Sequence, residues 1–362
     1  MSESATASAP AKTQPKAKKN RLSSGFFRFV LTRFLLIIPT VFILVTIVFF
    51  VMRATGDPIS AAMGGRLTPE ELQRRIHAAG YERPLVVQYL DYLGGLLRGD
   101  LGTTLTDNQP VTTILTRYGA ATFELAFLSL IVALIVGIGL GRLAARRRDH
   151  AADAGIRVFA ILCYATPVFF LGLMLKLVFA VWLNVLPPSG RSSFASDMQF
   201  QRLVSPTGFY IIDAFQLGDM SVLVDVLRHA VLPALALGLL TAGVFIRLVR
   251  TNVISTYTSG YVEAARSRGV SEGRLLSKHA WRPAMIPIIT VMGMQIALML
   301  AGAVLTETTF EWKGLGFMLS QYLKQRDFVA VQGIVILIAI IVAVVNFIVD
   351  VISALIDPRV RY

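Results

Sequence analysis

Residues Phe34 to Met52 read FLLIIPTVFILVTIVFFVM, nineteen residues without one charged side chain. At 1.5 Å of rise per helical residue, this stretch can cross the hydrocarbon core of a bilayer, which is about 30 Å thick. It is too long for the apolar core of a signal peptide, and no small-residue cleavage site follows it. We therefore predict a membrane-spanning helix here.

Five more apolar stretches follow the first along the chain, at about 121–141, 158–182, 230–246, 284–305 and 328–350. Irregular backbone cannot face lipid, so each stretch is predicted to be a helix, and Pro233 is placed in the first turn of the fourth. Hydrophobic residues make up 55% of the chain and charged residues 16%, against roughly a quarter charged in soluble domains. The predicted fold is an all-α integral membrane protein with six transmembrane helices, and an ordinary soluble enzyme is excluded.

Charge is distributed unevenly between the loops. With the N-terminus inside, the segments 1–33, 142–157, 247–283 and 351–362 hold 21 Lys and Arg residues against 6 acidic residues. The loops on the other side hold 13 basic and 15 acidic residues. Because cytoplasmic loops are enriched in Lys and Arg, the N- and C-termini are both predicted to be cytoplasmic. Topology thus explains the net charge of +13, and no nucleic-acid partner is predicted.

The chain divides into a tail and one transmembrane domain. Residues 1–25, rich in Ala, Ser, Pro and Lys, are predicted to form a disordered cytoplasmic tail. Residues 26–362 are predicted to form the transmembrane domain. That domain is expected to carry an outer subdomain at 53–120 and an outer loop at 306–327.

The outer segments carry several local signals. In the outer subdomain, Thr68-Pro69-Glu70-Glu71 is a capping box that Gly80 can close at the other end, and Leu85 to Leu97 is amphipathic. The loop 183–229 is predicted to be irregular. The aromatic, glycine-rich start of loop 306–327 is consistent with an aromatic belt or with a re-entrant hairpin, and an amphipathic stretch follows it from Phe317 to Leu323.

A helical hairpin is predicted at 258–283. Ser259 can cap a helix over Gly260 to Arg268, and Gly269 suits the left-handed residue that ends it. Ser271 can cap a second helix, which Pro283 is expected to break. The first helix presents small residues, with Tyr261, Ala264 and Ala265 on one side at positions i, i+3 and i+4. Such a surface predicts close contact with another protein.

Uncharged polar residues and glycine mark the candidate translocation path. Thr166 and Pro167 should bend the third span, because proline removes a backbone hydrogen bond. Gln295 and Gly302 lie two turns apart on one face of the fifth span, and Glu307 ends that span. Helix packing is the alternative role for Gly302 and is expected for the pair Gly137 and Gly141.

Two charged residues lie inside predicted spans. Lys176 can extend outward from the third span, and Asp350 lies near the inner end of the last span, where a cytoplasmic Arg is its expected partner. The single cysteine, Cys163, has no neighbouring base, and the four histidines form no ligand pair. No catalytic residues, metal ligands or bound cofactor are therefore predicted.

The hairpin carries the first sign of a family. Glu263-Ala264-Ala265, then three residues, then Gly269, resembles the EAA loop of ABC-importer permeases, which docks a coupling helix into a cleft of the cytoplasmic ATPase. The resemblance implies that ATPase coupling rests on Tyr261, Glu263, Ala264, Ala265, Arg268 and Gly269. We name residues 258–283 the coupling hairpin.

The wider chain resembles the dipeptide/oligopeptide/nickel permeases of the binding-protein-dependent transport systems over about 25–362. This resemblance implies a type I ABC-importer permease fold in a bacterial cytoplasmic (inner) membrane. The motifs that carry it occur in the expected order: Gly99-Asp100-Leu101-Gly102, Thr122 to Leu125, Ala165 to Phe169, His229 to Pro233, His279 to Pro287, Gly314 to Gly316, Arg326 to Phe328 and Asp357 to Tyr362.

The resemblance also implies an assembly. This chain would pair with a second homologous permease, two ATPase subunits and an extracytoplasmic peptide-binding protein, and would pass di- or oligopeptides across the lipid bilayer. The sequence contains no G-x-x-x-x-G-K-[ST] phosphate loop, so ATP and Mg²⁺ are expected on the ATPase subunits. A permease for nickel or glutathione in the same family and a secondary transporter are the alternatives.

Overall fold

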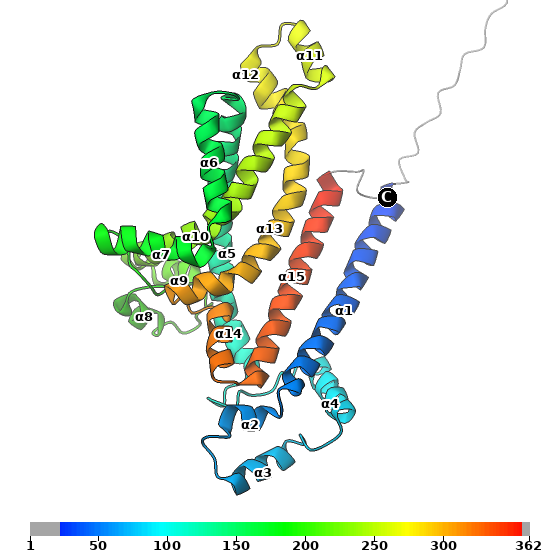
Figure 1. Cartoon of the computed structure of the whole chain (residues 1–362), viewed down its shortest axis with the longest axis vertical. Coiled ribbons are helices and arrows are strands. Elements are labelled where there is room, and N and C mark those ends of the chain that lie inside the picture. Colours follow the sequence, from blue (N-terminus) through cyan, green and yellow to red (C-terminus); the bar gives the residue numbers. More distant parts are fainter. Residues whose placement is uncertain (1–21, 357–362) are drawn as a thin grey trace, which may run out of the picture.

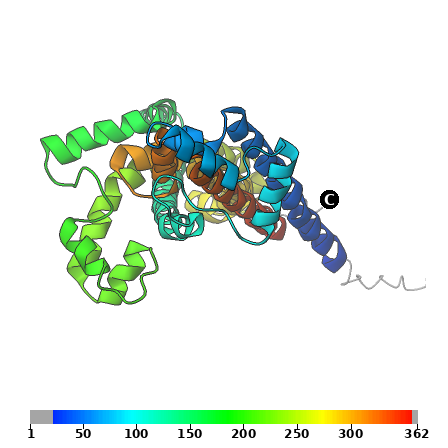
Figure 2. The ribbon, with the colours of Figure 1, turned by 90° about the horizontal axis from the view of Figure 1, so that it is seen from below.

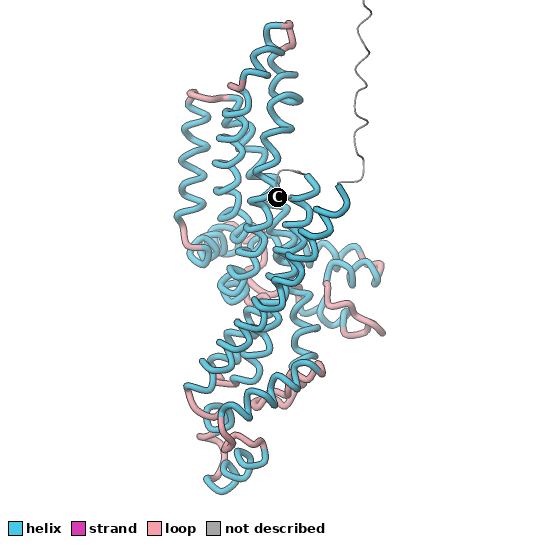
Figure 3. Tube along the Cα trace, turned by 90° about the vertical axis from the view of Figure 1, so that its right-hand side faces the viewer, coloured by secondary structure: helices cyan, strands magenta, loops and turns pink. Residues whose placement is uncertain are grey.

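The computed structural model describes residues 22–356, and within that range the chain is helical apart from short connections and one isolated bridge between Thr103 and Pro110 (Figures 1 and 3). The predicted tail falls largely outside the described residues, except that residues 22–25 belong to the first helix. The helices are α1 (Leu22–Ala54), α2 (Pro58–Met63), α3 (Pro69–Ala78), α4 (Leu85–Leu97), α5 (Val111–Arg146), α6 (Ala151–Ala165), α7 (Val168–Leu175), the π-helical segment η1 (Lys176–Trp182), α8 (Phe194–Phe200), α9 (Tyr210–Leu217), α10 (Met220–Tyr257), α11 (Gly260–Ser267), α12 (Glu272–Arg274), the π-helical segment η2 (Leu275–Ala280), α13 (Trp281–Phe310), α14 (Leu315–Lys324) and α15 (Phe328–Ile356).

Four helices are long and apolar enough to cross a membrane by themselves: α1, α5, α10 and α15. Two bent pairs complete a set of six. The first is α6 with α7 and η1. The second is the run from Glu272 to Leu300, which bends by 44° near Pro287 and whose first part, up to Pro283, belongs to the coupling hairpin. The predicted all-α membrane fold is confirmed. The bend that Thr166 and Pro167 predict in the third span is present, whereas the bend in the fifth is not anticipated from the sequence.

The third span is broken at Thr166 and Pro167. The axes before and after the break differ by 109°, far more than the bend that the sequence predicts. Pro167 has no N–H to donate, and its ring disfavours helical backbone at the preceding residue. Thr166 is accordingly extended, with φ −79° and ψ 126°, and α7 starts in a new direction.

The fourth span is longer than predicted. Helix α10 runs over 38 residues from Met220 to Tyr257 and contains Pro233 in its interior. Asp219 caps it by accepting a hydrogen bond of 2.9 Å from the Ser221 N–H. The helix therefore includes ten residues that hydropathy assigns to the outer loop, and it extends past the apolar stretch at its other end.

The outer subdomain follows the prediction, and the next outer segment contains helices that the sequence does not predict. Helices α3 and α4 form where the sequence predicts them, with the Thr68 hydroxyl accepting from the Glu71 N–H and Gly80 in the left-handed region at φ +72°. Segment 183–229, predicted to be irregular, contains α8 and α9 instead. Helix α8 begins after Ser193, whose hydroxyl accepts from the Ser196 N–H.

The helices are arranged along the long axis of the molecule (Figure 1). The α5–α6 turn and the pair α11 and α12 lie at the upper end, and α2, α3 and α14 lie toward the lower end. The start of α1 and the end of α15 also lie at the upper ends of these helices (Figure 1). Seen from below, α7, α8 and α9 project from one side of the bundle (Figure 2). The described parts of the four basic segments, 1–33, 142–157, 247–283 and 351–362, thus lie toward the same end of the molecule.

Helix α10 is the centre of the packing. It runs beside α5, α6, α7 and α13, and Leu237, Phe245 and Ile246 on it are fully buried. One buried cluster joins four helices near the break in the third span, through Leu125 of α5, Val168 of α7, Leu237 of α10 and Met299 of α13. This cluster fixes α7 against α13.

Candidate functional site

The coupling hairpin lies at the upper end of the molecule, beyond the ends of α5 and α6 (Figure 1). Its first helix, α11, ends at Ser267, one residue before the predicted end. Gly269 follows at φ +80°, and an added Cβ there would meet no atom within 4 Å. A left-handed backbone, and not crowding, is thus the reason for glycine at this position.

One face of the hairpin is buried and the other is open. Val262 and Leu275 are fully buried and hold α11 against η2. Glu263, Ala264 and Arg268 are exposed, Tyr261 is half-exposed, and Ala265 is partly buried. The residues with a predicted docking role are therefore available to a partner, apart from the inner side of Ala265.

Polar contacts fix the shape of the hairpin from inside. Arg266 Nε lies 2.8 Å from Glu272 Oε1, and the Tyr257 hydroxyl donates to the other carboxylate oxygen of Glu272. The pKa of Glu272 is lowered below its ordinary value, mainly by the hydrogen bond from the Tyr257 hydroxyl and next by that from the Arg266 guanidinium. The Tyr261 hydroxyl also donates to the His279 carbonyl at 3.3 Å. These contacts tie α11 to the segment that enters α13.

Two details of the predicted hairpin are wrong. Ser259 and Ser271 occupy the positions before α11 and α12, but neither side chain caps its helix; the Ser259 hydroxyl donates backward to the Thr256 carbonyl at 2.5 Å. Pro283 does not break the second helix either. It is the third residue of α13, and the helical backbone passes through it without interruption from η2. The chain therefore runs without a loop from Glu272 to Phe310.

Two of the predicted path residues lie at the break in the third span. Thr166 donates its hydroxyl to the Leu162 carbonyl at 2.6 Å, and Pro167 directly precedes α7. Gln295 and Gly302 lie on α13, and both are partly buried. A Cβ at Gly302 would reach ordinary contact with Leu237 at 3.6 Å, so this glycine is not needed for packing. The buried cluster around Val168 and Met299 brings the break close to the Gly302 region of α13.

Glu307, the fifth predicted path residue, is fully buried. Its carboxylate accepts from the Thr122 hydroxyl at 2.6 Å and from the Phe317 N–H at 2.8 Å. The Thr122 hydroxyl in turn accepts from the Leu315 N–H at 2.8 Å. Glu307 therefore holds the connection between α13 and α14 against α5, a role that its place at the end of an apolar stretch does not reveal.

A buried ion pair lies beside Glu307 and escapes sequence reasoning. Arg191 Nη2 is 2.6 Å from Glu124 Oε2, with both side chains less than a tenth exposed. Glu124 also accepts from the Ile211 N–H, and Arg191 donates to the Gly208 carbonyl. The pair connects the irregular part of segment 183–229 to α5. Glu124 lies within a motif, but no local signal identifies Arg191 as its partner.

The two charges inside predicted spans both have partners. Lys176 donates to the Thr309 carbonyl at 2.9 Å and lies 5.6 Å from the centre of the Phe310 ring. It therefore joins η1 to the end of α13 instead of extending outward. Asp350 lies 3.4 Å from Arg33 of α1, which confirms the expectation of an Arg partner near the inner end of the last span.

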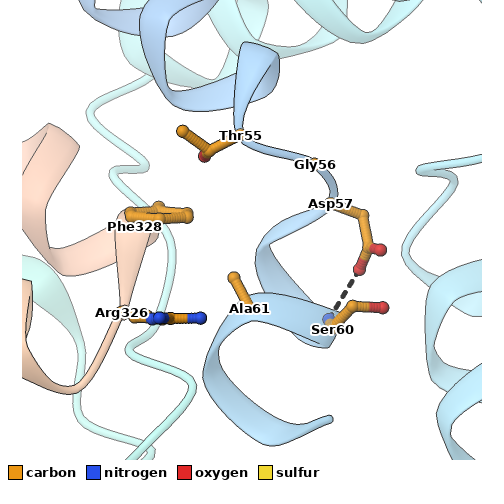
Figure 4. A pocket seen from close by; sticks show the side chains of 7 residues that line it. All are labelled: Thr55, Gly56, Asp57, Ser60, Ala61, Arg326 and Phe328. Carbon is orange, nitrogen blue, oxygen red and sulfur yellow. Dashed lines mark hydrogen bonds between the residues drawn. The ribbon is translucent and has the colours of Figure 1, made fainter.

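A cavity of about 400 Å³ lies between the α1–α2 junction and the start of α15 (Figure 4). Arg326 extends toward Ala61 across it, while the Asp57 carboxylate turns to the Ser60 N–H, from which it accepts at 2.7 Å. Within residues 22–356, no group of three or more His, Cys, Asp or Glu residues could hold a metal ion. Arg326 gives this cavity one cationic wall.

Comparison with protein families gives two matches that together cover most of the chain. Residues 137–362 match the family described as "Binding-protein-dependent transport system inner membrane component". Residues 26–125 match the family described as "Binding-prot-dependent transport system membrane comp, N-term". The second match includes α1 and the outer subdomain, and the first includes the coupling hairpin.

Individual relatives extend over nearly the full length. The di/tripeptide transport system permease protein DppB of Pseudomonas aeruginosa is 36% identical over 336 residues, which are 92% of this chain and 98% of that protein. The dipeptide transport system permease protein DppB of Escherichia coli K12 is 37% identical over 338 residues, 92% of this chain and 99% of that protein. Among solved structures, inward-facing MetNI methionine ABC transporter is similar with 15% identity and a TM-score of 0.49, over 68% of this chain and 97% of that chain.

Proposed function

Because this chain belongs to the family of binding-protein-dependent transport system inner membrane components, we propose that it is a permease subunit of an ATP-driven importer of di- and oligopeptides. The observation that carries the proposal is the match to dipeptide permeases across 98–99% of their length. Because the chain belongs to this family, we set aside the alternative of a secondary transporter.

The proposed assembly contains this chain, a second homologous permease, two ATPase subunits and an extracytoplasmic peptide-binding protein. The termini and the coupling hairpin face the cytoplasm, which the excess of Lys and Arg on those segments supports. The outer subdomain 53–120 and the outer loop 306–327 face the binding protein. ATP and Mg²⁺ bind to the ATPase subunits, and this chain needs no cofactor of its own.

The coupling hairpin is proposed to transmit the movement of the ATPase to the transmembrane helices. Its exposed residues Tyr261, Glu263, Ala264 and Arg268 enter a cleft of the ATPase, together with the outer side of Ala265. The continuous run from Glu272 to Phe310 supports a direct mechanical connection. A displaced hairpin moves α13 because no flexible loop separates them.

The translocation path is proposed to run past the break in the third span and the neighbouring part of α13. Thr166, Pro167, Gln295 and Gly302 contribute backbone-sized space and hydrogen-bonding groups, which suit a substrate with many different side chains. Glu307 acts on the path indirectly, by holding the connection between α13 and α14. The alternative substrates, nickel and glutathione, are distinguished by experiment.

Transport by the complete reconstituted importer tests this function. Proteoliposomes holding both permeases and both ATPases, with ATP inside, should take up a radiolabelled dipeptide when the binding protein is added outside. Glu263→Lys and Ala265→Asp should abolish uptake while peptide binding to the binding protein is unchanged. The first reverses a charge on the docking surface, and the second puts a larger, charged side chain where a small residue permits close contact.

The matched control is Ala152→Asp, an exposed alanine at the same end of the molecule but outside the hairpin. This variant should transport normally. Uptake of nickel or glutathione in place of peptides would disprove the peptide substrate, and normal uptake by both hairpin variants would disprove the coupling role.

A further inference from the structure

A second cavity, of about 360 Å³, lies between α6 and α10 toward the hairpin end of both helices. One part of its wall is apolar, with Ala160, Ile161, Val244 and Ile246. The other part is strongly basic and carries three arginines on two helices. The lining residues that the argument uses are Arg157, Ile161, Tyr164, Gly243, Arg247 and Arg250.

The apolar end of this groove is closed by direct contact between the two helices. A Cβ added to Gly243 would lie 2.7 Å from the Ala160 carbonyl oxygen and 3.2 Å from the Tyr164 nitrogen. The absence of a side chain at Gly243 therefore lets α10 touch the backbone of α6. The cavity lies beside this contact and extends to the arginines.

The basic end carries more positive than negative charge. Asp153 is fully buried and receives two hydrogen bonds from Arg250, at 2.6 and 2.7 Å. Arg157 lies 3.8 Å from the same carboxylate. Arg247 lies over the Tyr164 ring at 5.8 Å, and no carboxylate among the described residues lies within ion-pair distance of it. Two of the three arginines thus share one carboxylate, and the third has no carboxylate partner among the described residues.

The arginines lie at the depth where a bilayer changes from apolar to polar. Arg157 directly precedes the apolar stretch 158–182. Arg247 directly follows the apolar stretch 230–246, and Arg250 lies three residues further on. The exposed side chains of Ile161 and Tyr164 continue along α6 into the apolar layer. A ligand with an anionic head and an apolar tail matches this order of groups.

We propose that the groove between α6 and α10 binds the phosphate headgroup of an anionic phospholipid in the inner leaflet. Arg157 and Arg247 contact the phosphate, Arg250 supplies further positive charge from its fixed position on Asp153, and an acyl chain follows Ile161 toward the membrane interior. Basic pockets between transmembrane helices on the cytoplasmic side bind anionic headgroups in this way. The assignment to the inner leaflet depends on the orientation proposed above. Lipid binding itself does not depend on the substrate being a peptide.

Lipid retention in nanodiscs tests the proposal. The purified importer is placed in nanodiscs of phosphatidylcholine with a minor fraction of phosphatidylglycerol, and bound lipid is identified by native mass spectrometry. Wild-type protein should retain phosphatidylglycerol selectively. The double variant Arg157→Gln/Arg247→Gln should lose about thirtyfold in affinity, while Arg157→Lys/Arg247→Lys should keep most of the binding because both charges remain.

The matched control is Arg147→Gln, an exposed arginine at the same end of the molecule but outside the groove. It should retain phosphatidylglycerol as wild type does, and all variants should unfold at the same temperature in pure phosphatidylcholine. Equal loss in Arg147→Gln would show a general effect of surface charge and overturn the proposal. Displacement of the lipid by inorganic phosphate alone, or photo-crosslinking from position 161 to the second permease, would overturn it as well.

Discussion

Thr122 on α5 donates a hydrogen bond of 2.6 Å to Glu307 at the end of α13, across 185 positions of sequence. The same hydroxyl accepts from the Leu315 N–H, and the second carboxylate oxygen of Glu307 accepts from the Phe317 N–H. Two side chains thereby satisfy the backbone groups that the turn between α13 and α14 leaves open. Trp312, also fully buried in this turn, donates its indole N–H to the Ala121 carbonyl at 2.9 Å. The turn is anchored to one helix of the bundle.

Glu307→Ala is expected to destabilise this turn strongly. The substitution leaves the Thr122 hydroxyl and the Phe317 N–H buried without their acceptor, at about 1–3 kcal/mol for each buried group. The thermal unfolding temperature of the purified chain should fall, and protection of residues 311–317 in hydrogen exchange should be lost.

Glu311→Gln is the control for that experiment, because Glu311 is an exposed glutamate four residues further on. Its unfolding temperature should equal that of wild type. If Glu307→Ala also unfolded at the wild-type temperature, the buried hydrogen bonds would not be what holds α14 in place.

The glycines of α5 allow a second test, in which neighbouring positions in one helix should respond in opposite directions. A Cβ at Gly141 would lie 2.7 Å from Val249 Cβ and 3.0 Å from the Ile246 carbonyl oxygen, whereas a Cβ at Gly139 would meet nothing within 4 Å. Gly141→Ala should therefore push α5 away from α10, at about 1–3 kcal/mol for overpacking. Gly139→Ala should be neutral or stabilising, because alanine favours helix over glycine. Thermal unfolding of both variants in one detergent measures the difference, and equal unfolding temperatures would contradict close packing at Gly141.

Features that depend on neighbouring residues could be predicted from the sequence. The apolar stretches lie within the long helices, Pro69 and Thr68 begin α3, Leu85 and Leu97 bound α4, and Gly269 ends α11 with a left-handed backbone. Each of these depends on hydropathy, capping or glycine geometry within a few residues. The candidate hairpin residues follow from the same local signals and from a motif.

Features that depend on distant partners could not be predicted. Hydropathy identifies only the apolar middle of the fourth span. The prediction therefore omits residues 220–229 and 247–257 at the two ends of α10. Proline at 167 predicts a bend, but the angle of 109° is set by contacts of α7 and η1 with α13, such as Lys176 with Thr309. Glu307 falls at the edge of an apolar stretch whether it lines a path or anchors a turn. Its hydrogen bonds to Thr122 and Phe317 depend on distant parts of the chain and cannot be read from that position.

The buried pair of Arg191 and Glu124 should behave as a unit. Removing one partner leaves a buried charge without compensation, which costs about 3–5 kcal/mol. Arg191→Met alone should therefore lower the unfolding temperature more than Arg191→Met combined with Glu124→Gln, because the amide oxygen of Gln can still accept from the Ile211 N–H. Thermal unfolding of both single variants and the double variant gives the coupling energy. Strictly additive effects would show that the two side chains do not interact.

The contacts of Glu272 make the fold of the coupling hairpin depend on pH. The Tyr257 hydroxyl and the Arg266 guanidinium favour the ionised carboxylate and so lower the pKa of Glu272 in the folded hairpin. The stabilisation is therefore fully present above the ordinary glutamate pKa of about 4.3. It is lost as the pH falls through the lower pKa of the folded state. Hydrogen exchange of residues 260–275, corrected for intrinsic rates, should show protection at about pH 6 that declines toward about pH 3.

Glu272→Gln separates this contact from general acid effects. The variant should show weaker protection of the hairpin at about pH 6, because glutamine carries no charge to pair with Arg266. The decline toward acid should then be smaller than in wild type, since the group that titrates is gone. Glu263→Gln, at an exposed position of α11 next to buried Val262, should keep the wild-type pH profile. An acid decline of wild-type size in Glu272→Gln would assign the pH dependence to another group and leave the Glu272 contacts without a measurable role in the hairpin.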